Sequence, residues 1–217
     1  MSFLVNTEGG LTTFGYVFFV LAAILLLVAA FVLLKKNNAS IQMTTKQIVY
    51  CSVAIALAYV CSYIKLFSMP FGGTVTLFSM LFIVLIANWY GAKIGILAGL
   101  AYGILQFLQE PYVLNFVQVC CDYIFAFAAL GIAGLFRNKK HGLLKGYVAG
   151  ILARGAFHSI GGYLFWMSYM PENFPKSLTA VYPIVYNYSF ILAEGVLTII
   201  LLSIPAVTKA LNQIKNM

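Results

Sequence analysis

Long apolar runs separated by short polar segments dominate this chain, and the length of each run is its clearest structural signal. An apolar run of about 20 residues is long enough to cross the hydrocarbon core of a bilayer as an α-helix. Runs bounded by charge, proline or glycine predict seven such helices, at residues 11–34, 48–67, 75–90, 94–108, 113–136, 143–167 and 183–207. Within residues 21–30 apolar and polar side chains do not alternate, so we expect helices rather than membrane-spanning strands.

Local sequence features refine the ends of these helices. The third and fourth runs are short and are joined by Gly91-Ala92-Lys93, which predicts a tight helical hairpin. Pro183 is expected in the first turn of the last helix. Backbone N–H groups in the first turn make no hydrogen bond within the helix, so a proline, which lacks this group, is tolerated there. A secretory signal peptide begins with basic residues, and no basic residue precedes Leu11. The first run is therefore predicted to remain as a permanent helix.

The composition agrees with a membrane protein and argues against a soluble domain. Of the 217 residues, 63% are hydrophobic and 8% are charged, and the mean hydropathy is +0.97. A water-soluble fold needs a charged and mixed surface, which so few charged residues do not supply. The pattern and the composition together predict an all-α integral membrane protein.

The 13 Lys and Arg residues are distributed unevenly between the two ends of the predicted helices. If the first helix runs from outside to inside, the outer side receives only Lys65 and Lys176, and Arg154 lies within a helix. The inner side receives Lys35, Lys36, Lys46, Lys93, Arg137, Lys139, Lys140, Lys145, Lys209 and Lys215. By the positive-inside rule, this asymmetry predicts an outside N-terminus and a cytoplasmic C-terminus. The net charge of +8 is thus explained by topology and contact with anionic lipid, and no nucleic-acid partner is expected.

Small residues at regular spacing indicate where helices approach closely. A spacing of four residues is shared by two sets, Gly91, Gly95, Gly99 and Gly103, and Ala54 and Ala58. Such strips form smooth surfaces on which helices pack. We favour internal packing for the glycines. The alanines are equally compatible with internal packing and with docking on a partner membrane protein.

The four cysteines, Cys51, Cys61, Cys120 and Cys121, all lie in predicted helices and form no Cys-x-x-Cys pair. We interpret them as small hydrophobic residues that are buried in the bundle. Because the histidines are not clustered either, neither a metal site nor a redox site is expected.

Four ionisable residues interrupt the apolar runs, and function is expected to lie with them. They are Asp122, Arg154, His158 and Glu194. An ionisable side chain at the centre of a membrane helix costs about 2.5 kcal/mol or more, so such residues usually face a cavity or one another. The alternative is a hydrogen-bonded network that only holds the helices together.

Polar neighbours share helix faces with two of these residues. Asn115, Gln118 and Asp122 are spaced i, i+3, i+7 on the fifth helix. Asn187 and Glu194 are seven residues apart on the last helix. Both spacings place the side chains on one face of an α-helix.

The sixth helix carries a polar and aromatic series at intervals of four, formed by Arg154, His158, Gly162 and Trp166. The histidine and the tryptophan flank a glycine gap whose shape would admit a flat ring. With the predicted topology, the aromatic ends of these helices would form a pocket that opens outward. The long outer connection at residues 170–182 is expected to close over it.

Further motifs follow one another along the chain in a recognisable order. They are Met69-Pro70-Phe71-Gly72-Gly73-Thr74-Val75-Thr76-Leu77-Phe78-Ser79-Met80, then Pro111-Tyr112, Gln118 and Asp122-Tyr123-Ile124-Phe125-Ala126-Phe127, then Arg154 with His158 and Phe165-Trp166, and finally Tyr182 with Tyr186-Asn187. In this order, over about residues 44–209, the chain resembles the thiamine-specific substrate-binding (S) components of energy-coupling factor (ECF) vitamin transporters. The resemblance implies a six-helix bundle over residues 44–217. The helix and basic linker of residues 1–43 would then be an addition.

The resemblance also implies a high-affinity thiamine site near the outer face. Carried over residue by residue, its members are Tyr112, Asp122, Tyr123, His158, Trp166, Tyr182 and Asn187. Thiamine combines a permanently cationic thiazolium with a flat aminopyrimidine, which call for a carboxylate, aromatic faces and amide groups. These residues supply each kind of group. No cofactor is expected, because thiamine is the transported ligand.

Energy for transport would have to come from other proteins. No Gly-x-x-x-x-Gly-Lys-[Ser/Thr] loop occurs in the sequence, so the chain itself is not expected to hydrolyse ATP. The resemblance implies a transmembrane coupling protein and two cytoplasmic ATPases as partners, with Ala54 and Ala58 as candidate docking residues. Three alternatives stay open. They are a component for another vitamin or a thiamine precursor, a membrane enzyme using His158 with Asp122 or Glu194, and a structural subunit.

Overall fold

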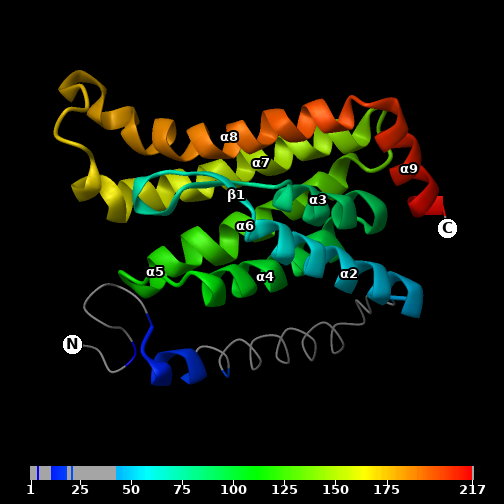
Figure 1. Cartoon of the computed structure of the whole chain (residues 1–217), viewed down its shortest axis with the longest axis horizontal. Helices are drawn as coiled ribbons and strands as arrows, with labels where there is room; N and C mark the ends of the chain where they lie inside the picture. Colours follow the sequence, from blue (N-terminus) through cyan, green and yellow to red (C-terminus); the bar gives the residue numbers. More distant parts are fainter. Residues whose placement is uncertain (1–3, 5–10, 19–20, 22–42, 217) are drawn as a thin grey trace.

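The computed structural model describes residues 4, 11–18, 21 and 43–216, which form a helical bundle with one two-stranded hairpin (Figure 1). In chain order the elements are α2 (Thr45–Ser62), β1 (Lys65–Ser68), η1 (Pro70–Gly72), β2 (Thr74–Thr76), α3 (Ser79–Tyr90), α4 (Ala92–Gln109), α5 (Phe116–Val119), η2 (Cys120–Phe125), α6 (Ala126–Ala128), η3 (Ala129–Phe136), α7 (Gly142–Gly161), η4 (Gly162–Trp166), η5 (Met167–Tyr169), η6 (Lys176–Val181), α8 (Tyr182–Leu202) and α9 (Pro205–Asn216). Six of the seven predicted runs fall within the described residues, and each contains a helix.

Four helical segments in the described part of the chain are long and apolar enough to cross a membrane. They are Thr45–Ser62, Ala92–Gln109, Phe116–Phe136 and Lys176–Leu202, and α3 is a shorter apolar helix. Large apolar side chains are also exposed along the outer faces of α2, α7 and α8, where a bilayer would cover them. The prediction of an all-α membrane bundle is therefore confirmed.

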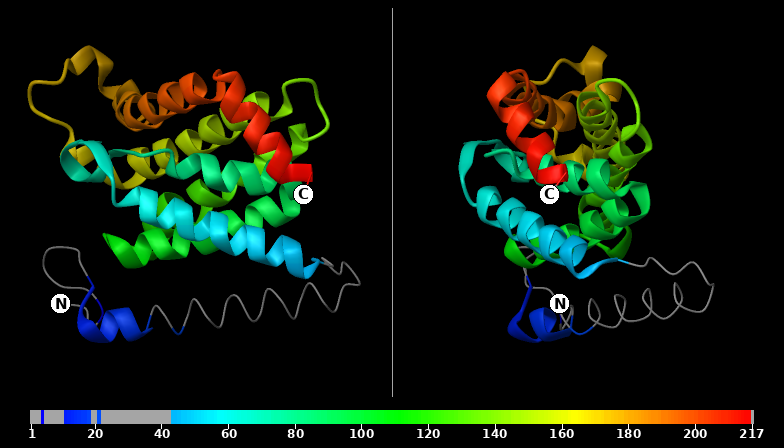
Figure 2. Two further views of the ribbon diagram at one scale, coloured as in Figure 1. Left: turned by 45° about the vertical axis from the view of Figure 1, so that its right-hand side comes forward. Right: turned by 90° about the vertical axis from the view of Figure 1, so that its right-hand side faces the viewer.

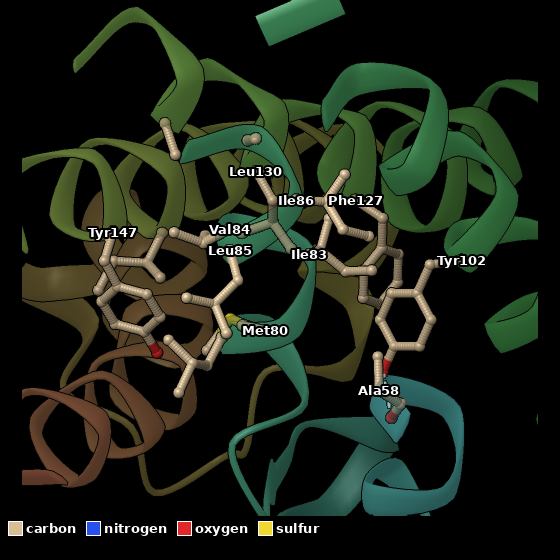
Figure 3. Close-up of a cluster of buried hydrophobic side chains, with 14 of the residues drawn as sticks. Ala58, Met80, Ile83, Val84, Leu85, Ile86, Tyr102, Phe127, Leu130 and Tyr147 are labelled. Atoms are coloured by element: carbon tan, nitrogen blue, oxygen red, sulfur yellow. Dashed lines mark hydrogen bonds between the residues drawn. The ribbon is translucent and has the colours of Figure 1, made fainter. Parts of the chain in front are cut away.

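Helix α3 lies at the centre of the bundle. It packs against α2, α4, η3 and α7, and residues 83–87 are at most 3% exposed. Figure 3 shows this core, with Tyr147 of α7 on one side of α3 and Tyr102 and Phe127 on the other. Helices α7 and α8 run side by side along one face, while α2 and α4 lie across α3 from them (Figures 1 and 2).

The glycine strip of α4 serves internal packing, as favoured from the sequence. An added Cβ at Gly99 would collide with the carbonyl oxygen of Phe127, and one at Gly103 with that of Tyr123. Helix α4 therefore meets the next helical segment at backbone distance. Gly91 joins α3 to α4 with a φ of 96°, a conformation that glycine adopts without strain, and this forms the tight hairpin that the sequence predicted.

The alanine pair on α2 faces inward. Ala54 is 6% exposed and Ala58 is 0% exposed. The hydroxyl of Tyr102 on α4 donates a hydrogen bond of 3.3 Å to the carbonyl of Ala58, as Figure 3 shows. Of the two alternatives left open by the sequence, the structure supports internal packing. The expected docking strip is therefore corrected to a packing contact between α2 and its neighbours in the bundle.

The predicted C-terminal end of the helix at residues 48–67 and the predicted N-terminal end of the helix at residues 75–90 are wrong. The first ends at Ser62 and the second begins at Ser79, because β1 and β2 form an antiparallel hairpin between them, with Lys65 opposite Thr76. Apolar residues continue across both boundaries, so the length of the run does not reveal the change. The turn contains Gly72, whose φ of 101° would strain any other residue.

The last and the first predicted helices lie at the two ends of the chain, and the structure describes the last one far more completely. Pro183 lies in the first turn of α8, as predicted, but α8 ends at Leu202 and a separate helix, α9, begins at Pro205. Of the first predicted run, residues 13–18 and 21 are helical and the rest lies outside the described residues. The division of the chain at residue 43 and the orientation of its termini stay predictions.

Candidate functional site

One end of the bundle encloses a polar and aromatic pocket of about 390 Å³ between the β1–β2 hairpin, α4, η2, α7 and α8. Cavities of this size, with a few polar groups among aromatic walls, are typical of small-molecule sites. All seven residues that the resemblance assigned to a vitamin site line it, namely Tyr112, Asp122, Tyr123, His158, Trp166, Tyr182 and Asn187. The lining also includes Gln106, Glu110, Gln118, Arg154, Tyr169, Tyr186 and Phe190.

Asp122 is the polar centre of the pocket, because three side chains converge on its carboxylate. Gln118 Nε2 and Trp166 Nε1 donate to Oδ2 at 2.8 and 3.2 Å. His158 Nδ1 lies 3.3 Å from Oδ1. A carboxylate offers about four lone-pair sites, so a position for a ligand group remains beside these three contacts. Of the predicted polar face, Gln118 and Asp122 line the pocket together, whereas Asn115 is the N-cap of α5, accepts from the N–H of Gln118 at 3.0 Å and does not line the pocket.

Both Asp122 and Trp166 lie on π-helical turns, η2 and η4. A π-helical turn inserts one extra residue into an α-helix and turns the following side chains to a new direction, and such turns are frequent at functional sites. Here the two turns face each other across the pocket and bring the indole N–H to the carboxylate. The regular interval of four between His158 and Trp166 is therefore not kept in the structure.

His158 links the carboxylate to a cation. Arg154 Nε donates to His158 Nε2 at 3.4 Å, and the guanidinium lies 4.3 Å from the centre of the Phe127 ring. Because a guanidinium only donates, Nε2 is the acceptor and Nδ1 carries the proton that points at Asp122. Asp122, His158 and Arg154 therefore form one polar chain along the pocket wall.

Three aromatic rings form the wall next to this chain. The Trp166 ring lies 5.0 Å from Tyr112 and 5.1 Å from Tyr169, measured between ring centres. The hydroxyls of Tyr112 and Tyr169 are 3.1 Å apart, and this hydrogen bond raises the pKa of Tyr112 to about 12. The Tyr112 phenol therefore stays neutral at physiological pH, and the wall offers flat ring faces for stacking.

Tyr123 holds the turn that follows α4. Its hydroxyl donates to the carbonyl of Glu110 at 2.7 Å and accepts from the backbone N–H of Tyr112 at 3.2 Å. Its ring lies 5.1 Å from Phe107 in an edge-to-face arrangement. The position of Tyr112 in the pocket thus depends on Tyr123.

Helix α8 supplies the opposite wall. Asn187 Nδ2 donates to the carbonyls of Pro183 and His158 at 2.8 and 3.2 Å. An added Cβ at Gly162 would lie 2.8 Å from Pro183 Cβ, so the glycine allows α7 and α8 to meet. The gap predicted to admit a flat ring between His158 and Trp166 is therefore partly filled by α8.

The β1–β2 hairpin covers one side of the pocket and is held by α8 and by α4. The hydroxyl of Tyr186 donates to the carbonyl of Pro70 and accepts from the N–H of Gly73. The ring of Phe190 occupies the space beside Gly73, where an added Cβ would approach it to 2.6 Å. An ion pair between Lys65 and Glu110 fastens the hairpin to the C-terminal end of α4.

Glu194 lies outside the pocket and has a structural role. It accepts hydrogen bonds from the backbone N–H groups of Thr76 and Met80 at 3.0 and 3.1 Å, and from the hydroxyl of Thr76 at 2.7 Å. Ser79 Oγ lies 3.4 Å from the same carboxylate. A carboxylate at the N-terminus of α3 also interacts favourably with the helix dipole. For Glu194 the alternative of a network that holds helices together is therefore the correct one.

Five aromatic or polar members of the pocket were not predicted from the sequence, namely Gln106, Glu110, Tyr169, Tyr186 and Phe190. Tyr186 lay within a recognised motif, but Tyr169 and Phe190 carry no local signal, since aromatic residues are abundant throughout this chain. Gln106 is uncharged and Glu110 lies between two predicted helices, so neither counted among the ionisable residues within the apolar runs. Within the described residues, no three His, Cys, Asp or Glu side chains gather closely enough to hold a metal ion. The carboxylate of Asp122 and the aromatic wall could hold an organic ligand that has a cationic group and a flat ring.

The chain is similar to known proteins in both its sequence and its fold. The family model described as thiamine transporter protein (Thia_YuaJ) matches residues 48–214. The chain is 34% identical over 167 residues to the thiamine transporter ThiT of Bacillus subtilis (strain 168), covering 66% of this chain and 82% of that protein. A solved structure of ThiT from Listeria monocytogenes shares the fold with a TM-score of 0.59, at 24% identity over 74% of this chain and 94% of that one.

Proposed function

The chain belongs to the thiamine transporter family, and from that premise and the geometry of the pocket we propose that it binds thiamine between η2, η4 and α8. The observation that carries this proposal is the convergence of a carboxylate, a histidine and an aromatic wall on one 390 Å³ pocket. Asp122 would face the cationic thiazolium, and the rings of Trp166 and Tyr112 would stack on the flat parts of the ligand. Asn187 and Gln118 would complete the polar contacts.

The charge of the pocket supports a cationic ligand. Glu110 is paired with Lys65, whereas Asp122 receives hydrogen bonds only from uncharged groups in the arrangement described above. A partly buried carboxylate without a cationic partner attracts a ligand that carries a fixed positive charge. Arg154 also lines the pocket, but its contacts are with His158 Nε2 and with the face of the Phe127 ring rather than with Asp122.

We further propose that the chain is the substrate-binding membrane subunit of an importer of the ECF type. The sequence lacks an ATP-binding loop, so a transmembrane coupling protein and two cytoplasmic ATPases would supply the energy. The pocket would open to the outside, with the C-terminus in the cytoplasm. Capture, closure of the 170–182 segment and reorientation of the bundle would then deliver the vitamin inward.

Calorimetric titration of the purified protein with a panel of vitamins tests the proposed ligand. The expected result is tight binding of thiamine and weak or no binding of riboflavin, biotin and pyridoxine. A thiamine precursor or analogue that binds more tightly than thiamine would assign the chain to that ligand instead. Turnover of any panel member would favour the membrane enzyme. No measurable binding of any vitamin in the panel would favour the structural subunit.

A further inference from the structure

A second apolar cluster lies behind the pocket and includes a residue from the N-terminal segment. Leu11 is 7% exposed and is grouped with the buried side chains of Phe107 and Val119. Tyr123 packs against the same cluster from the pocket side. Leu11 precedes residues 48–214, the part of the chain that the family model matches, so this contact is an addition to the family bundle.

Contacts of the described residues next to Leu11 hold it in place. Thr12 caps the helix that follows it, since its hydroxyl accepts from the N–H of Gly15 at 3.0 Å. The N–H of Thr12 donates to the carbonyl of Leu4 at 3.0 Å. An added Cβ at Gly15 would collide with the same carbonyl of Leu4. Leu11 therefore lies next to a capped helix N-terminus.

The cluster connects with the pocket through two rings. Phe107 contacts Tyr123 edge to face at 5.1 Å, and the hydroxyl of Tyr123 bonds both Glu110 and Tyr112. A loss of packing around Phe107 would let the Tyr123 ring shift, because a void removes contacts on one side of the surrounding side chains. The turn that carries Tyr112 would lose its anchor with it.

We propose that Leu11 is a positioning residue for the ligand pocket, acting through Phe107 and Tyr123. The N-terminal segment thereby stabilises the α4–η2 wall from behind and improves binding without touching the ligand. This inference rests on the proposed thiamine site. It gives the segment before the family bundle a role in affinity.

The test compares two leucines of the same segment in the full-length protein. Leu11→Ala is expected to weaken thiamine binding by about three- to tenfold and to speed its dissociation. Leu21→Ala is the matched control, because Leu21 is 56% exposed, and it should bind like the parent. Leu11→Met keeps the buried volume and should restore parental binding.

A double-mutant cycle separates positioning from a general loss of stability. In the Tyr123→Phe background the link to the turn is already cut, so adding Leu11→Ala should change binding by less than about twofold. Full additivity in this cycle, or parental binding by Leu11→Ala, would overturn the inference. If the parent itself does not bind thiamine, the proposed function fails. A parent that binds while Leu11→Ala has no effect refutes only the role of the N-terminal segment.

Discussion

Replacing Asp122 by Asn removes the charge at the centre of the pocket and keeps the shape of the side chain. In the parent, Oδ2 accepts from Gln118 and Trp166, and Oδ1 lies next to His158 Nδ1–H. An amide presents one oxygen and one NH₂ group. At least one of these three donors must therefore face another donor in the variant, in addition to the loss of attraction for a cationic ligand.

The expected effect follows from these two losses. A mismatched buried hydrogen bond costs about 1–3 kcal/mol, and breaking a desolvated charge pair costs about 2–5 kcal/mol. The mismatched hydrogen bond destabilises the free protein as well as the complex, so part of its cost does not change the binding free energy. We therefore expect Asp122→Asn to weaken thiamine binding by about 1.4–4 kcal/mol, which is tenfold to about a thousandfold.

Calorimetric titration of parent and variant with thiamine measures this difference directly. The neutral aminopyrimidine fragment of thiamine serves as a second ligand, and its affinity should change much less because it has no fixed charge. Glu172→Gln removes an exposed carboxylate from the 170–182 segment and should be nearly silent. Parental thiamine affinity in a folded Asp122→Asn protein would refute the assignment of the cation to this carboxylate.

Other changes test separate parts of the structure. Trp166→Ala removes the stacking face and one donor to Asp122, so titration should show at least tenfold weaker thiamine binding. Glu194→Gln places an NH₂ group against backbone donors and should lower the free energy of unfolding by about 2–4 kcal/mol in thermal or denaturant melts. Gly103→Leu should prevent α4 from meeting the next helix and abolish folded protein in gel filtration. Cysteine accessibility mapping should find residues 137–145 inside and residues 170–182 outside; the reverse labelling would overturn the orientation.

The existence of the helices could be predicted from the sequence, because a segment that crosses the hydrocarbon core must be long enough to span it and must be largely apolar. The hairpin between Lys65 and Thr76 did not follow, since a strand pairing depends on contacts across the turn, which the length of an apolar run does not reveal. The inward face of α2 was also ambiguous. A small-residue strip looks the same whether it packs on α4 or on another protein.

The members of the pocket were largely predictable because polar residues are rare in these helices. Asp122 and His158 stood out for their cost in hydrocarbon, and the motif order added the tyrosines and Asn187. The local geometry was not predictable. Two π-helical turns shift the register of Asp122 and Trp166, and Tyr169 joins the wall only through the fold of the segment after η4.

The central claim is that thiamine binds against the aromatic wall, and tryptophan fluorescence tests it most directly. The chain has two tryptophans, of which Trp166 lines the pocket and Trp89 lies on α3. In a Trp89→Phe protein, thiamine is predicted to quench the remaining emission saturably, with the affinity found by calorimetry. In a Trp166→Phe protein, the emission of Trp89 is predicted to stay constant. Calorimetric binding of thiamine that leaves Trp166 emission unchanged would contradict the account, because the vitamin would then bind elsewhere.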